Sequence, residues 1–212
     1  MIATFSDSQR QLVVDAIKAA ERRSSGEIVV TAARESDDYI HVPLHIAAAA
    51  AFAVGLGIAI VQWRGSWYDF SLWQVLAIQL AVFVVIAALL SLDAVRRAIT
   101  PRRLMTKYAH RNAASQFLAL NAHTTVGRTG VLIFISQIER YCEIVGDTAI
   151  TAAVPQAEWQ AIIDAMLPML RRGKVADALV MATQRCGGVL ARYFPPSTDN
   201  PDELPDRFIV LE

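Results

Sequence analysis

The sequence predicts an α/β fold, a small mixed β-sheet flanked by helices and interrupted by a two-helix transmembrane hairpin. Two long apolar runs without formal charge predict the hairpin. Three β-branched runs, separated by segments with helical periodicity, predict the sheet and its flanking helices. The expected parts are the N-terminal portion of one soluble domain (1–42), the hairpin (43–93) and the C-terminal portion of the same domain (94–212).

The N-terminal portion predicts one helix and one strand. Ser6 to Gln9 have the form of a capping box, and apolar residues then recur at helical spacing, so we expect an amphipathic helix over residues 7–23. The run 28–33 is β-branched and suits a buried strand. A polar segment, 34–38, separates this strand from the first apolar run.

The two apolar runs, Leu44 to Val61 and Leu72 to Leu92, are long enough to cross a bilayer. At about 1.5 Å per residue, roughly 20 residues span a hydrocarbon core of about 30 Å. The link between them is short, and aromatic rings in or beside it suit a headgroup boundary. These rings belong to Trp63, Trp67, Tyr68 and Trp73. The alternative is two buried helices of a soluble core, which the weakly hydrophobic stretch 47–51 favours.

Positive charge follows the second run and predicts its orientation. The link carries one arginine, Arg64, whereas residues 96–111 are strongly basic and residues 1–40 contain no signal peptide pattern. The positive-inside rule therefore predicts a multi-pass protein of the cell inner membrane with both termini in the cytoplasm. We expect contacts with anionic lipid headgroups, rather than with nucleic acid, from Arg96, Arg97, Arg102 and Arg103.

The C-terminal portion predicts helices around a β-hairpin. A helix should start at Thr100-Pro101 and run to about residue 122. The runs 131–136 and 141–145 should form the hairpin. Two helices, 155–171 and 175–193, follow, and then an acidic, proline-containing tail, 199–206. Residues 208–211 either add an edge strand or simply pack on the domain.

Composition restricts the function further. The formal charge is zero and 54% of the residues are apolar, so the balance as a whole predicts no nucleic-acid partner. Cys142 and Cys186 are isolated from each other and from histidine, which favours two reduced, buried thiols.

Several blocks of the sequence together form a recognisable family pattern: 26–30, 129–136, Glu139-Arg140, 143–147, 194–196 and 203–206. This pattern resembles the TPM domain, a phosphatase-like domain of thylakoid-lumen and bacterial envelope proteins. The resemblance implies a compact α/β domain with a small mixed sheet and, for some members, weak acid phosphatase activity with divalent-metal binding. This sequence departs from the pattern at Ala149, where a second glycine is usual, and in the hairpin inserted after the first strand.

The predicted strands divide the acidic residues between two edges of the sheet. If 28–33 and 131–136 are parallel, Glu27 and Asp147 lie at one edge, while Asp37, Asp38 and Glu139 lie at the other, which should face the membrane. Glu27 and Asp147 are the candidate ligands for a divalent cation, Ca²⁺ or Mg²⁺, and Asp147 is the candidate catalytic residue. The alternative for Asp147 is a capping carboxylate, and for Asp37 and Asp38 a solvated turn.

Two functions remain open at this point. The first is a membrane-anchored module that binds a protein partner or regulates it at the cytoplasmic membrane face, with the lipid bilayer as its other partner and no cofactor. The second is a weak metal-dependent phosphatase, which rests on the resemblance alone. The sparse acidic residues and Ala149 favour the first.

Overall fold

The computed structural model describes residues 5–65, 70–196, 204 and 207–211. Trp67, Tyr68 and the acidic tail apart from Leu204 therefore lie outside the described residues. The chain forms two compact units, which we call the sheet unit (Met1–Ser36 with Met105–Glu212) and the hairpin unit (Asp37–Leu104). The helices and strands, in chain order, are α1 Asp7–Glu21, β1 Glu27–Ala33, α2 His41–Trp63, α3 Leu72–Leu90, α4 Asp93–Ile99, α5 Arg102–Ala119, β2 Gly130–Ser136, β3 Tyr141–Gly146, α6 Thr148–Ala153, α7 Gln156–Arg171, α8 Val175–Tyr193 and β4 Phe208–Leu211.

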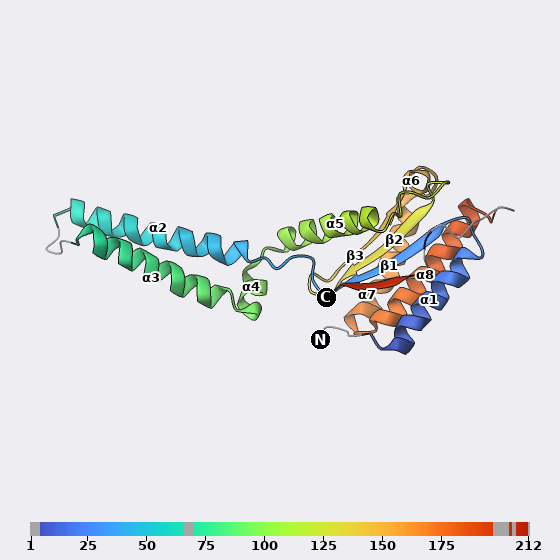
Figure 1. Ribbon diagram of the computed structural model, residues 1–212, viewed down its shortest axis with the longest axis horizontal. Coiled ribbons are helices and arrows are strands. Elements are labelled where there is room, and N and C mark those ends of the chain that lie inside the picture. Colours follow the sequence, from blue (N-terminus) through green and yellow to red (C-terminus); the bar gives the residue numbers. More distant parts are fainter. Residues whose placement is uncertain (1–4, 66–69, 197–203, 205–206, 212) are drawn as a thin grey trace. The chain divides into compact units, whose positions relative to one another are not determined.

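The sheet is mixed and four-stranded, in the order β3-β2-β1-β4 (Figure 1). β1 pairs in parallel with β2 on one side and with β4 on the other, and β2 pairs antiparallel with β3. β1 and β2 are parallel, which is the condition under which the acidic residues divide between two edges of the sheet, and the predicted β-hairpin is confirmed. Of the two alternatives for residues 208–211, the structure has the edge strand.

Helices cover the two faces of the sheet unequally. Alternate side chains of β1 and β2, such as Ile28 and Val131, enter a large core with α1, α7 and α8. The opposite set, such as Val29 and Leu132, packs against Ala113 and Phe117. Figure 1 shows α5, the helix that carries these two residues, on that face of the sheet. One face is thus covered by three helices and the other chiefly by one, which leaves room for a pocket on the face that α5 covers.

Two short helices were not predicted. α6 begins directly after Asp147, which caps its N-terminus. α4 lies between α3 and α5, and Thr100 hydroxyl donates to the Arg96 carbonyl oxygen (2.7 Å) at its C-terminal end. Thr100 therefore caps the end of α4 rather than the start of α5, whose first residue is Arg102.

The hairpin unit contains two helices that are long and apolar enough to cross a membrane, α2 and α3. Their contact uses the small residues Ala47, Ala51 and Gly55 of α2, each one turn apart. A Cβ atom on Gly55 would lie 2.1 Å from Gln79 Nε2, and this nitrogen donates to the Ala51 carbonyl oxygen (3.2 Å). The absence of side-chain bulk on α2 thus lets a polar side chain of α3 bond to its backbone.

Two adjacent glycines of α8 provide a stability test. A Cβ on Gly187 would lie 2.5 Å from Ala20 Cβ and 2.9 Å from its Cα, whereas a Cβ on Gly188 has nothing within 4 Å. We expect Gly187→Ala to lower the free energy of unfolding by about 2 kcal/mol, because α1 and α8 must separate. Gly188→Ala should raise it by about 0.5–1 kcal/mol through helix propensity. Urea unfolding of the full chain, followed by pulse proteolysis, measures both; equal effects would contradict the close packing.

Candidate functional site

The N-terminal edge of the sheet carries Glu27 and Asp147 on either side of Gly130. Glu27 is the register partner of Gly130, and the Asp147 backbone N–H donates to the Gly130 carbonyl oxygen (2.9 Å). Both carboxylate side chains are buried, with 4% and 5% of their surfaces exposed. The structure thus places both predicted residues at the same edge of the sheet. Glu27 is on β1 and Asp147 directly follows β3, the two strands that flank Gly130 on β2.

Asp147 has a structural role at this edge. Its Oδ1 accepts from the Thr148 backbone N–H (2.6 Å), which caps α6. Its Oδ2 is buried without a hydrogen-bond partner among the described residues and lies 3.9 Å from a guanidinium nitrogen of Arg128. Asp147 therefore has the contacts of a capping carboxylate, which was the alternative to a catalytic role in the sequence analysis.

The residues at this edge do not fit Ca²⁺ or Mg²⁺. Ca²⁺ takes six to eight oxygen ligands and Mg²⁺ six, with several carboxylates in protein sites. Within the described ranges, no group of three or more histidine, cysteine, aspartate or glutamate side chains is placed to hold a metal. The guanidinium of Arg128, 3.9 Å from Asp147 Oδ2, also supplies the positive charge that a metal ion would bring to this carboxylate. We therefore derive no catalytic step through a metal.

The three acidic residues predicted for the other edge of the sheet accept hydrogen bonds from backbone N–H groups. Glu139 is 1% exposed, its Oε1 accepts from the Ser36 backbone N–H (2.9 Å), and its Oε2 accepts from the Ser136 hydroxyl. Asp37 and Asp38 each accept from the backbone N–H two residues ahead (2.8 and 3.2 Å) and so stabilise the turn that leads into α2. Each of the three side chains thus serves local structure.

A third polar group, formed by His110, Glu143 and Tyr141, was missed from the sequence. His110 Nδ1 lies 2.9 and 3.0 Å from the two carboxylate oxygens of Glu143, and the Tyr141 hydroxyl donates to Oε2 (2.9 Å). Burial, reinforced by the Glu143 charge and hydrogen bond, raises the pKa of Tyr141 far above 10.0. The period-two spacing of Tyr141 and Glu143 was the available signal, but nothing local placed His110 opposite them.

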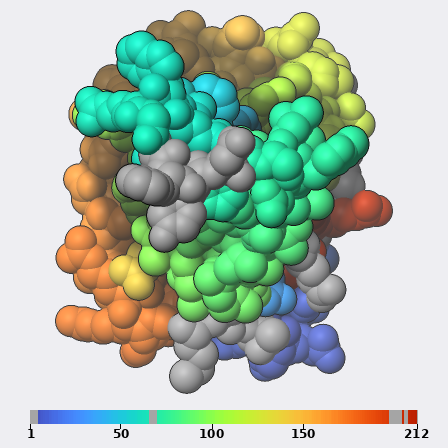
Figure 2. Space-filling model, turned by 90° about the vertical axis from the view of Figure 1, so that its left-hand side faces the viewer, coloured from blue at the N-terminus to red at the C-terminus, as the bar shows by residue number. Residues whose placement is uncertain are grey.

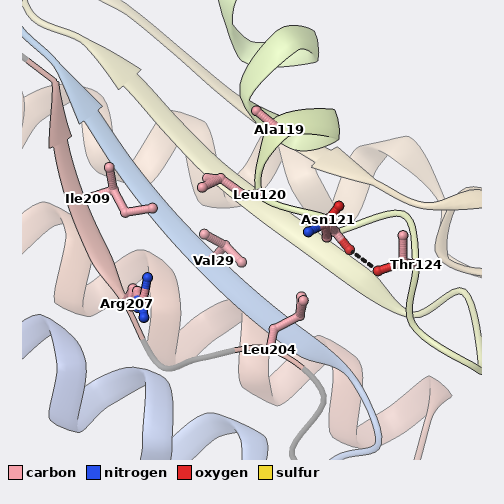
Figure 3. A pocket seen from close by; sticks show the side chains of 8 residues that line it. All are labelled: Val29, Ala119, Leu120, Asn121, Thr124, Leu204, Arg207 and Ile209. Atoms are coloured by element: carbon pink, nitrogen blue, oxygen red, sulfur yellow. Dashed lines mark hydrogen bonds between the residues drawn. The ribbon is translucent and has the colours of Figure 1, made fainter.

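A pocket of about 310 Å³ lies on the face of the sheet that α5 covers, beyond the C-terminal end of this helix (Figure 3). Its floor is apolar, with Val29 of β1 and Ile209 of β4. Its rim is polar: Figure 3 shows Asn121 and Thr124 joined by a hydrogen bond (2.7 Å) on one side and Arg207 on the other. The remaining lining residues are Ala119, Leu120 and Leu204. This arrangement suits an apolar side chain or small group flanked by a hydrogen-bonding or anionic one.

Neither cysteine has the environment of a nucleophile. Cys186 is fully buried, and Cys142 is only partly buried, so the predicted buried thiol holds for one of the two. Burial, with a smaller contribution from Asp164, raises the pKa of the Cys142 thiol from 9.0 to about 11. Both are free thiols.

Alkylation should report this raised pKa. At pH 8 we expect Cys142 to react about 100-fold more slowly in the folded chain than in urea, because its thiolate fraction falls by that factor. Mass spectrometry of the Cys142 peptide after timed iodoacetamide exposure measures the rate. Stability gained from the neutral thiol is present below pH 9 and is lost as the pH rises through about 11. A folded-state rate equal to that in urea would contradict the burial.

Comparison with known proteins shows which family the chain resembles. The family model described as the TPM domain matches residues 96–189, less than half of the chain. Over these residues the chain is similar to the TPM domain. The matched segment runs from within α4 to within α8, so α1, β1 and β4, which complete the sheet and core, lie outside it.

A solved structure supports the same fold over the whole chain. The NMR structure of BA42 protein from the psychrophilic bacteria Bizionia argentinensis sp. nov. is similar with a TM-score of 0.59 and 20% sequence identity. The similarity covers 98% of this chain and 96% of that chain. At this identity it shows the fold alone. No curated protein matches the chain.

Proposed function

We propose that this TPM-like domain is anchored in a membrane by α2 and α3 and binds a protein partner at the membrane surface without catalysing a reaction. The single observation behind the anchoring is the exposure of the apolar side chains of α2 and α3, whose residues are coloured cyan to green in Figure 2. In the most apolar 18-residue stretch of each helix, 11% of α2 is buried and none of α3 is buried. The core helix of a soluble protein would be mostly buried.

The energetic argument is the cost of leaving these side chains in water. Burying one Leu, Val or Phe side chain is worth about 1.5–3 kcal/mol. A bilayer supplies that environment along both helices, which are 23 and 19 residues long. The exposed large apolar side chains of α2 and α3 are Leu44, Ile46, Phe52, Leu56, Ile60, Val61, Trp63, Leu72, Trp73, Leu76, Leu80, Val84, Val85 and Leu89.

Two lysines on α3 test the anchoring. Leu80 and Val84 are exposed and one turn apart near the middle of the helix. In a membrane each lysine there costs about 2.5–3.5 kcal/mol, so the Leu80→Lys/Val84→Lys variant should leave the alkaline-carbonate membrane pellet in which the wild type remains. In water the same changes would be harmless. The matched control, Leu12→Lys/Leu118→Lys on exposed positions of α1 and α5, should stay in the pellet. A wild type released by carbonate would contradict the anchoring.

The orientation proposed from the positive charge has its own test. In a Cys142→Ala background, a cysteine at Ser66, which lies in the link outside the described residues, should react with an impermeant maleimide on intact cells. A cysteine at Ser115, on an exposed position of α5, should react only after lysis. The reversed labelling pattern would place both termini on the other side.

The lack of catalysis rests on the local structural roles of Asp147, Glu139, Asp37 and Asp38, whose carboxylates accept hydrogen bonds from nearby backbone N–H groups. Purified full-length chain in detergent should not hydrolyse p-nitrophenyl phosphate with Mg²⁺, Ca²⁺ or Mn²⁺. Turnover that is lost in Asp147→Ala and kept in Asp177→Ala, a change on α8, would support the weak metal-dependent phosphatase instead.

The pocket beyond α5 is the place where we propose that the partner binds. A photo-crosslinking residue at Ala119, which lines the pocket, should give a crosslinked species in intact cells. The same residue at the exposed Leu12 of α1, whose helix covers the opposite face, should not. Identical crosslinking from the two positions would contradict a partner at the pocket.

A further inference from the structure

The two sides of α5 carry different chemistry. Met105, Ala109, Ala113 and Phe117 follow one another at intervals of four residues and are buried. Arg103, Lys107 and Arg111 are offset from this row by two positions, also at intervals of four, and are exposed. An offset of two residues turns about 200° around a helix, so the basic row lies opposite the buried one. We call Arg103, Lys107 and Arg111 the basic stripe.

The basic stripe works against the stability of its own helix. Like charges four residues apart repel each other, and the stripe contains two such pairs. Basic residues in the first turn, where α5 has Arg102 and Arg103, also face the positive end of the helix dipole. α5 contains no acidic residue that would offset either effect.

Two arginines of other helices form salt bridges within the chain. Arg96 of α4 pairs with Asp93 (2.8 Å), and Arg192 of α8 pairs with Glu158 of α7 (2.9 Å). Across the described residues, no salt bridge is recorded for Arg103, Lys107 or Arg111. Arg96, which was expected to contact lipid, thus has an acidic partner within the chain, whereas the exposed cations of the basic stripe have no recorded salt bridge.

We propose that the basic stripe binds the anionic phospholipid headgroups of the membrane that α2 and α3 enter. This inference rests on the proposed anchoring. Only α4 separates α3 from α5 in the chain, so the stripe follows the second apolar helix closely in sequence. A surface of clustered negative charge removes the repulsion along the stripe and complements the first turn of α5. Arg103 was predicted to contact lipid, and Lys107 and Arg111 extend that contact along one helix face.

Hydrogen exchange of α5 in nanodiscs tests the proposal. Full-length chain is placed in discs of phosphatidylcholine alone, or of phosphatidylcholine with phosphatidylglycerol, and exchange is followed by mass spectrometry. We expect residues 102–119 to exchange about tenfold more slowly in the anionic discs, and high salt should remove the difference.

The Arg103→Gln/Lys107→Gln/Arg111→Gln variant should lose the response to lipid composition. Because the repulsion is gone, its α5 should also exchange more slowly than wild type in neutral discs, a change that lost folding would not produce. The matched control, Arg10→Gln/Lys18→Gln/Arg22→Gln, removes three exposed charges from α1 and its C-cap and should keep the wild-type response.

The outcomes separate this inference from the anchoring. A chain that fails to stay with discs of either composition on gel filtration overturns the anchoring, and this inference with it. A retained chain whose α5 exchanges equally in both discs overturns the lipid contact alone. Equal protection of α5 in neutral discs by soluble double-stranded DNA or by inorganic phosphate would also overturn it, in favour of a general anion site.

Discussion

Glu139→Ala is expected to lower the free energy of unfolding of the sheet unit by about 3 kcal/mol. The side chain is 1% exposed and accepts from the Ser36 backbone N–H and the Ser136 hydroxyl. Alanine leaves both donors without this acceptor, at about 1–3 kcal/mol for a buried group, and opens a cavity. Pulse proteolysis across a urea series measures the loss.

Two variants control this result. Glu139→Gln keeps the shape and one oxygen acceptor, so its effect should be about 1 kcal/mol. Glu158→Ala removes a glutamate whose ion pair with Arg192 is largely exposed, and it should cost no more than about 0.5 kcal/mol. If Glu139→Ala is no more harmful than Glu158→Ala, the buried network does not join β1 to the β2–β3 turn as described.

Gly130→Ala should destabilise the sheet unit by about 3 kcal/mol or more. A Cβ at this position would lie 1.9 Å from the Ala122 carbonyl oxygen and 2.8 Å from its carbon. The obstacle is backbone, so a rotamer change cannot relieve it. β2 or the loop after α5 must move, and this loop contributes Asn121 and Thr124 to the pocket. The same urea series, with chemical shifts of the loop as a second readout, detects both effects.

Gly127→Ala is the matched control for Gly130→Ala in the same loop. Its Cβ would meet the Thr129 side chain at 3.4 Å, an ordinary contact, so the change in unfolding free energy should stay below about 1 kcal/mol. A similar loss from both variants would mean that the conformational freedom of glycine in this loop matters, rather than the contact with Ala122.

Local pattern predicted most of the fold. The uncharged apolar runs predicted α2 and α3, and the β-branched run at 131–136 predicted β2, because length and composition suffice for both. The short helices α4 and α6 were missed since six or seven residues hold too little periodicity to detect. The role of β4 stayed open because four apolar residues fit an edge strand and a packed tail equally well.

The candidate site was less predictable, since its contacts cross long stretches of chain. The sequence placed Glu27 and Asp147 at one edge, and the structure agrees, but only the structure shows Asp147 capping α6 beside Arg128. His110 and Glu143 are 33 positions apart, and their pairing depends on how α5 crosses the sheet.

By itself, the sequence determined the two apolar helices, the β-hairpin and the resemblance to the TPM domain, because each is encoded in short, continuous patterns. Only the tertiary structure decided which side chains are available for function. It assigned Glu139, Asp37 and Asp38 to backbone hydrogen bonds, and it left the pocket and the basic stripe of α5 open. The physical reason is that burial and hydrogen-bond partners depend on residues brought together from distant parts of the chain, which no local pattern records.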